Sequence, residues 1–115
     1  MKHIQDYYAP ILGEFELVVL LTLLRLGNGT WGAAIRRDLQ ERTGRELPVS
    51  VVYVTLQRLE KKGMVRSYIG PPTAERGGRR RRHYLIDTKG EQAMGRSYRT
   101  IKRLTSGMEE QLEHL

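Results

Sequence analysis

The stretch "SVVYVTLQRLEKKGMVRSYIGPPTAERGGRRRRHYLI", Ser50 to Ile86, combines one helix pattern with two strand patterns. Apolar residues recur four and three positions apart at Val52, Leu56 and Leu59. This spacing predicts a helix from the cap residue Ser50 to Gly63, with the apolar stripe buried. "MVRSYIG" then alternates apolar and polar residues, and "RRRRHYLI" follows as a returning strand. Because "PPTAERGG" between them predicts a long turn, the segment predicts a helix followed by a β-hairpin.

Two further helices are predicted before this stretch. "FELVVLLTLLRL", Phe15 to Leu26, is apolar but shorter than the roughly twenty residues of a membrane span, so it predicts a buried core helix. "GNGT" is a turn in which Thr30 is the expected cap of a second helix, Trp31 to about Thr43. Ile35 and Leu39 face the core in that helix, and Trp31 continues their stripe.

The predicted order is three helices, two strands and a last helix. An isolated hairpin is unstable in water, so it must pack on the helices, which is the winged helix-turn-helix arrangement. The predicted fold class is mainly α with a small β-hairpin and a long C-terminal dimerisation helix. The predicted division is an N-terminal extension (1–12), a winged helix-turn-helix DNA-binding domain (13–87) and the dimerisation helix (88–115).

Charge is concentrated in the predicted hairpin turn. The 115-residue chain has a net charge of +7, and five arginines without an acid lie between Arg76 and Arg82. Such a run is often only solvated, but beside a helix-turn-helix it favours a contact with a polyanion. The chain has no cysteine, its three histidines are scattered and no phosphate-binding loop is evident, so neither catalysis nor a metal or cofactor is expected.

The helix from Ser50 is the expected recognition helix, whose N-terminal end enters the major groove. Hydroxyls of Ser50 and Tyr53 can donate to phosphates, Val51 and Val54 can touch thymine methyls, and Gln57 can pair with adenine. The alternative for Tyr53 is a residue at the rim of the core. The predicted DNA contacts are Ser50, Val51, Tyr53, Val54, Gln57, Arg58, Lys61, Arg79, Arg80, Arg81 and Arg82.

The arginine run lies on a strand, where alternate side chains face opposite sides. Arg79 and Arg81 are therefore expected to reach DNA, with Arg80 and Arg82 along the other face. Because the chain twists near a turn, all four could also approach phosphate or the minor groove.

The last segment predicts one helix from a capping box at Thr88 and Glu91 to Leu115, about 40 Å long. Spacings of four and three residues make a heptad seam with one polar member, Thr105. A helix that extends past the core needs a second copy to cover this seam, aided by the N-terminal "IQDYYAPIL". The predicted dimerisation residues are Met94, Tyr98, Ile101, Leu104, Met108, Leu112 and Leu115.

Two motifs carry a family resemblance. The run Tyr-x-x-Leu-x-x-Leu-x-x-x-Gly occurs at Tyr53, Leu56, Leu59 and Gly63. The run Gly-Arg-Arg…Tyr…Thr-x-x-Gly follows at Gly78, Arg79, Arg80, Tyr84, Thr88 and Gly90. From about residue 12 to residue 94 the chain resembles the PadR family of transcriptional regulators, in the form with a short C-terminal helix.

The resemblance implies a winged helix-turn-helix DNA-binding repressor that acts as a homodimer on an inverted-repeat operator. Trp31 and Val54 depart from the usual tyrosine and proline of the family, so base preference does not transfer from a relative. Some members bind planar apolar molecules between the dimer helices, which makes a small apolar effector near Met94, Tyr98 and Met108 a hypothesis beside plain core packing.

Two alternatives stay open at the level of sequence. One is a basic RNA-binding or ribosome-associated protein that uses "RGGRRRR" without sequence preference. The other is a protein-interaction module whose winged fold no longer contacts DNA. The N-terminus lacks a signal-type apolar stretch and the chain lacks cysteine, so we expect a cytoplasmic protein without a membrane partner.

Overall fold

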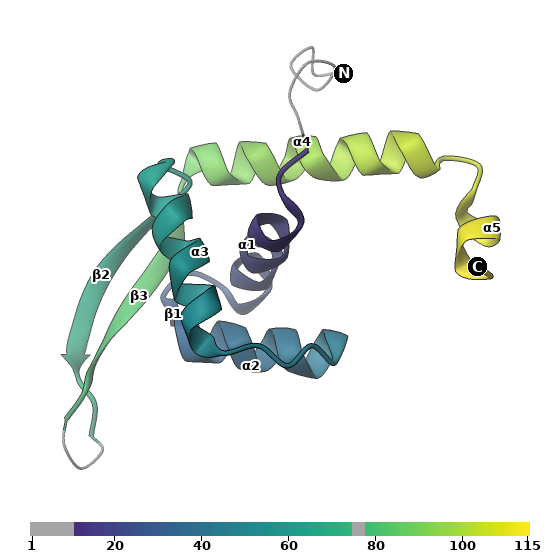
Figure 1. The fold of residues 1–115 in the computed structure, drawn as a ribbon. Coiled ribbons are helices and arrows are strands. Elements are labelled where there is room, and N and C mark those ends of the chain that lie inside the picture. The colour runs from purple at the N-terminus through teal and green to yellow at the C-terminus, as the bar shows by residue number, and fades with distance from the viewer. Residues whose placement is uncertain (1–10, 75–77) are drawn as a thin grey trace.

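A computed structural model describes residues 11–74 and 78–115, and Figure 1 shows its architecture. The elements in chain order are α1 (Glu14–Leu26), β1 (Thr30–Trp31), α2 (Gly32–Thr43), α3 (Val49–Lys61), β2 (Val65–Pro72), β3 (Arg80–Ile86), α4 (Thr88–Thr105) and α5 (Glu109–Glu113). The first three helices and the sheet form a body, from which α4 runs outward so that α5 lies far from the hairpin. None of the helices in these ranges is both long and apolar enough to cross a bilayer.

The core lies where α1, α2, α3, the sheet and the first half of α4 meet. Its buried members are Val19, Leu20, Leu23, Ile35, Val52, Leu56, Leu59, Val65, Tyr84 and Met94. The apolar stripes predicted for the second and third helices are therefore confirmed, because Ile35 and Leu39 are buried, as are Val52, Leu56 and Leu59.

The sheet contains a strand that the sequence prediction missed. The described residues form a three-stranded antiparallel sheet in the order β1-β3-β2, with Thr30 opposite Tyr84 and Trp31 opposite His83. Thr30 therefore does not cap the second helix, and Trp31 does not continue its stripe. Trp31 has extended backbone angles and precedes α2, which begins at Gly32. β-branched and aromatic side chains suit such a strand.

The hairpin strand β2 is longer than predicted, because it continues through Pro71 and Pro72 instead of turning there. Ile69 pairs with Arg82 and Pro72 with Arg80, with an irregularity in the register between the two pairs. Prolines are tolerated here because β2 is an edge strand of the sheet. The predicted turn includes residues 75–77 and with them Arg76, which lie outside the described residues.

The C-terminal segment is not one helix. Asp87, not Thr88, is the N-cap of α4, and its side chain accepts a hydrogen bond from the Thr88 N–H. The helix ends at Thr105, and Gly107 then adopts a φ of +82°, which turns the chain before α5. The left-handed region is open to glycine without steric cost, so this residue ends the predicted continuous helix. The 18 residues of α4 span about 27 Å.

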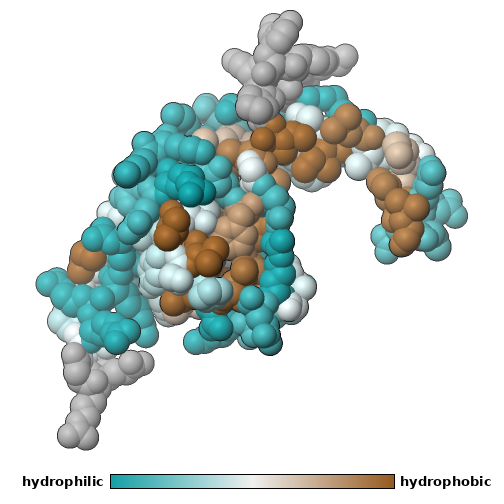
Figure 2. Space-filling model, viewed as in Figure 1, coloured by the Kyte–Doolittle hydropathy of each residue, from teal (hydrophilic) through white to brown (hydrophobic). Residues whose placement is uncertain are grey.

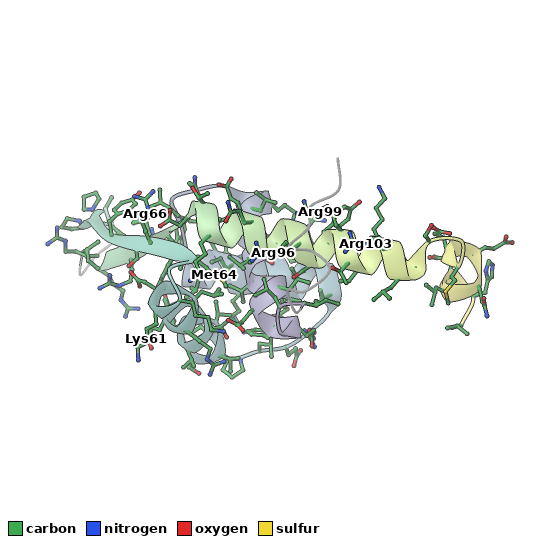
Figure 3. The ribbon with its side chains drawn as sticks, turned by 90° about the horizontal axis from the view of Figure 1, so that it is seen from above. Lys61, Met64, Arg66, Arg96, Arg99 and Arg103 are labelled. Carbon is green, nitrogen blue, oxygen red and sulfur yellow. The ribbon has the colours of Figure 1, made fainter. Side chains whose placement is uncertain are left out.

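The start of α4 is fixed to the body by a close backbone approach. The Asp87 N–H donates to the Met64 carbonyl at 2.9 Å, and a Cβ added at Gly90 would lie 2.2 Å from that oxygen. Figure 3 shows Met64 at the start of α4, with Arg96, Arg99 and Arg103 following one another along the helix. Only a residue without a side chain fits at this approach.

The N-terminal extension (1–12) is described only at its last two residues. There, the Leu12 N–H donates to the buried Ser97 hydroxyl of α4 at 3.0 Å. The part of "IQDYYAPIL" up to residue 10 that was expected to help cover the seam lies outside the described residues.

Candidate nucleic-acid interface

The outer face of α3 combines exposed apolar and cationic side chains. Val54 is 53% exposed although it is apolar, and Val51 beside it is exposed as well. The other exposed members of the predicted set on this helix are Ser50, Gln57, Arg58 and Lys61. Two exposed valines about one turn apart near the N-terminus of a helix are removed from water only when another surface covers them.

Tyr53 lies half-buried on the flank of α3, at the rim of the core. Its ring rests on the first residue of α2, since a Cβ added at Gly32 would lie 2.6 Å from the Cε1 and Cζ atoms of Tyr53. Gly32 therefore provides the space that sets the position of this ring. The ring packs on the body at the rim of the core, and the side chain also lines an open groove.

That groove separates α3 from the hairpin. It has a volume of about 380 Å³, and its lining residues are Tyr53, Gln57, Glu60, Arg82 and Tyr84. Tyr84 forms its buried floor, and burial raises the pKa of the Tyr84 hydroxyl above its ordinary value, with smaller electrostatic effects from neighbours. Hydroxyl, amide, carboxylate and guanidinium groups thus surround one opening beside α3.

The arginine run alternates between the two faces of β3, as predicted, but the side that faces α3 is not the expected one. Arg82 shares its face with the buried Tyr84 and lines the groove. Arg81 lies on the opposite face, where its guanidinium carbon sits 4.6 Å from the centroid of the Trp31 ring. Since Tyr84 must point into the core, the two-residue period of a strand carries Arg82 to the α3 side.

The other two arginines of the run are exposed. Arg80 Nε donates to the Gly70 carbonyl at 3.1 Å, which holds its stem along the edge strand. Arg79 directly precedes β3, and its carbonyl accepts a hydrogen bond from the Thr73 N–H at 3.1 Å. All four guanidinium groups therefore project from one short strand and its approach.

An aromatic cluster on the far face of the hairpin was missed by the sequence prediction. The rings of Tyr68 and His83 are stacked with centroids 5.0 Å apart, and Trp31 meets His83 edge-on at 5.8 Å. The His83 Nδ1 atom is hydrogen-bonded to the Gly29 carbonyl at 2.5 Å. Tyr68 and His83 occupy paired positions on the two predicted strands, a signal that could have indicated the stack, whereas Trp31 enters through β1.

Several cations of the body are used to hold helices together. Asp38 forms ion pairs with Arg25 of α1 and Arg42 of α2, and the hydrogen bond from Arg25 lowers the pKa of the Asp38 carboxyl. Lys62 Nζ lies 2.8 Å from Glu16 Oε2, and Arg45 pairs with Glu14. These cations thus have carboxylate partners within the body, whereas Arg79 to Arg82 have no acid among them in the sequence.

The arm formed by α4 and α5 exposes a row of large apolar side chains. Tyr98 is 59% exposed and Leu104 66%, and the row continues with Ile101, Met108, Leu112 and Leu115. Figure 2 shows hydrophobic surface along the inner side of this arm, around the hollow between arm and body. Met94 differs from the prediction, because it is only 5% exposed and belongs to the core of its own chain.

The described residues contain no group of three or more His, Cys, Asp or Glu that could hold a metal ion. No curated protein matches the chain. Solved structures do match it, among them three PadR-family or PadR-like regulators. The regulator from Clostridium difficile is 23% identical, with a TM-score of 0.63, covering 82% of this chain and 96% of that chain.

The second, from Bacillus cereus, is 16% identical with a TM-score of 0.65, covering 85% of this chain and 90% of that one. The third, from Eggerthella lenta, is 22% identical with a TM-score of 0.65, covering 87% of each chain. These likenesses establish the winged-helix fold. Residues 20–96, about two thirds of the chain, match the family described as "Transcriptional regulator PadR-like family". The protein therefore belongs to the PadR-like family, whose members are DNA-binding transcriptional regulators and not enzymes.

Proposed function

We propose that this protein is a sequence-specific repressor that acts as a homodimer on an inverted-repeat operator. The observation that carries the proposal is the groove beside α3, where Tyr53 and Gln57 of the helix lie opposite Arg82 of the hairpin. A duplex that places its major groove on α3 brings its phosphates to the hairpin.

In this arrangement α3 and the hairpin have different roles. Val51, Val54 and Gln57 lie where base edges pass, and contacts of this kind distinguish sequences. Ser50, Tyr53, Arg58 and Lys61 surround them with hydroxyl and cationic groups that suit phosphate oxygens. The hairpin arginines, Arg79, Arg80, Arg81 and Arg82, supply charge that neutralises the backbone without regard to sequence.

The arm supports the dimer part of the proposal. An exposed row of large apolar side chains is costly in a monomer, and a second copy with the same row removes it from water. The proposed surface consists of Tyr98, Ile101, Leu104, Met108, Leu112 and Leu115, with the exposed Leu21 and Leu24 of α1. Met94 is left out because its own chain already covers it.

The proposed dimer would set two recognition helices about 34–36 Å apart, one turn of the duplex. We keep the division into a DNA-binding domain (13–87) and an arm (88–115), with the first half of α4 serving the core of the body. A cytoplasmic location belongs to the same proposal, and a small apolar effector near Tyr98 and Met108 stays a prediction that ligand titration would test.

The deciding experiment is selection of bound fragments from genomic DNA, followed by a footprint of the best fragment. A two-fold symmetric footprint with half-sites one turn apart supports the proposal. Competition with random duplex and with structured RNA in the same gel separates the alternative of a non-specific RNA-binding protein. Equal competition by RNA, or a protection pattern without symmetry, would contradict the proposal.

A further inference from the structure

Three side chains connect the end of α3 to the hairpin in one chain of hydrogen bonds. Arg82 Nη1 of β3 donates to the Ser67 hydroxyl of β2 at 3.0 Å. The same hydroxyl donates to Glu60 Oε2 of α3 at 2.7 Å. Ser67 thus accepts from the guanidinium with one of its two lone pairs and donates its proton to the carboxylate.

The fold determines the positions of the three side chains in this hydrogen-bonded series. Ser67 lies opposite Tyr84, whose ring is buried, so the strand period places Ser67 on the face toward α3. Glu60 and Arg82 both line the groove that also holds Tyr53 and Gln57. The only short side chain of the three is therefore held between two long, exposed ones.

This geometry affects what Arg82 can do for a ligand. A guanidinium has five N–H donors, and the bond to Ser67 occupies one on Nη1. The Nε and Nη2 edge remains, which is the pair of parallel donors that binds a phosphate in bidentate fashion. An unrestrained arginine loses side-chain entropy on binding, so a guanidinium already held by a hydroxyl loses less.

We propose that Ser67 is a positioning residue, which together with Glu60 fixes the Arg82 guanidinium at one place relative to α3 for contact with a DNA phosphate. The inference rests on the proposed function, because it concerns how the hairpin cooperates with the recognition helix. A purely structural role, in which Ser67 only ties β2 to Glu60, is the alternative that the experiment must separate.

The experiment compares Ser67→Val with Ser67→Thr, two β-branched replacements of similar size that differ in the hydroxyl. Dissociation constants are measured on the duplex selected from genomic DNA, for each variant alone and combined with Arg82→Ala. We expect Ser67→Thr to bind like the wild type and Ser67→Val to bind about fivefold more weakly, which is the size of one ordinary net hydrogen bond. In the Arg82→Ala background the two replacements should be equal.

The double-variant comparison detects positioning, since a structural defect at Ser67 would weaken binding whether or not Arg82 is present. Equal affinities for Ser67→Thr and Ser67→Val in the wild-type background would overturn the inference, as would a fivefold difference that persists without Arg82. Circular dichroism checks folding, and Ser67→Ala replaces Ser67→Val if the valine disturbs β2. Failure of the wild-type protein to bind any duplex would instead refute the proposed function, so the two failures are distinct.

Discussion

The outer face of α3 and the α4–α5 arm both expose apolar side chains, but among different neighbours. Val51 and Val54 lie between hydroxyls, an amide and cations on α3 and the hairpin. On the arm, Tyr98, Ile101 and Leu104 recur three residues apart, and a helix of about 3.6 residues per turn places Arg96, Arg99 and Arg103 on its other side. The mixture on α3 and the hairpin is complementary to a DNA groove, whereas the apolar row on the arm is complementary to another apolar surface.

The largest effect should come from replacing Arg79 to Arg82 together by alanine. Each phosphate that is no longer neutralised should lower affinity roughly tenfold near 0.1 M salt and reduce the salt slope by about 0.9. Fluorescence anisotropy on selected and random duplexes measures both quantities, and the weakening should be similar for both. Arg103→Ala on the arm is the matched control and should change binding little. If the salt slope of the hairpin variant is unchanged, the phosphate contacts are made by another surface of the protein.

The arm is tested by Leu104→Glu, which places a carboxylate in the exposed row. We expect the dimer dissociation constant to rise about a hundredfold, the loss of a central anchor with a buried charge added. Sedimentation equilibrium measures the association, and Gln92→Glu, which adds the same charge elsewhere on α4, should leave it unchanged. A Leu104→Glu protein that sediments like the wild type would exclude this row from the interface.

The connection between the two regions is tested at two glycines of α4. Gly90→Ala should lower the free energy of unfolding by about 2 to 3 kcal/mol, because its Cβ meets the Met64 carbonyl and backbone must shift. Gly95→Ala should raise it by about 1 kcal/mol, since its Cβ meets only the movable end of Arg99. Urea unfolding of both variants checks the opposite signs. Equal effects would mean that α4 is not held at Met64.

The smallest expected effect concerns Asp38, whose pKa is lowered chiefly by the hydrogen bond from Arg25. A lowered folded-state pKa gives stability that is present above the unfolded value of about 3.9 and is lost as pH falls through the folded value. The Asp38 pairs lie at the surface, so we expect less than about 1 kcal/mol. Denaturant unfolding at pH 6 and pH 3 should show a difference that Asp38→Asn reduces. A larger pH effect in Asp38→Asn would contradict the assignment.

The sequence predicted the body well because its periodic patterns report burial directly. The stripe of Val52, Leu56 and Leu59 is buried, and the residues on the other side of that helix are exposed. Hairpin, helix order and family followed from the same local patterns. The face of Arg82 was missed because the prediction did not start from Tyr84, whose burial determines which arginines share its side.

Two of the errors depend on partners far away in the chain, and a third depends on the local backbone of one glycine. Thr30 and Trp31 form a two-residue strand that no local pattern marks, and its partner lies more than fifty residues later. Met94 has the spacing of the seam, but periodicity does not tell which chain covers a stripe. Gly107 lies within a regular heptad spacing of apolar residues, and that spacing does not reveal the positive φ at which its backbone turns the chain.

The short strand β1 has a mechanical consequence for the hairpin. Its pairs with Tyr84 and His83, and the bond from the Gly29 N–H to the Tyr84 carbonyl, clamp the base of the hairpin to the start of α2. The irregular register between Ile69 and Pro72 lies beyond this clamp, toward the tip. Because the pairing of the two strands is interrupted at this step, we expect the hairpin to bend there. Arg82, which lies before this step, should keep its place beside α3, whereas Arg79 and Arg80, which lie past it, should move with the tip of the hairpin.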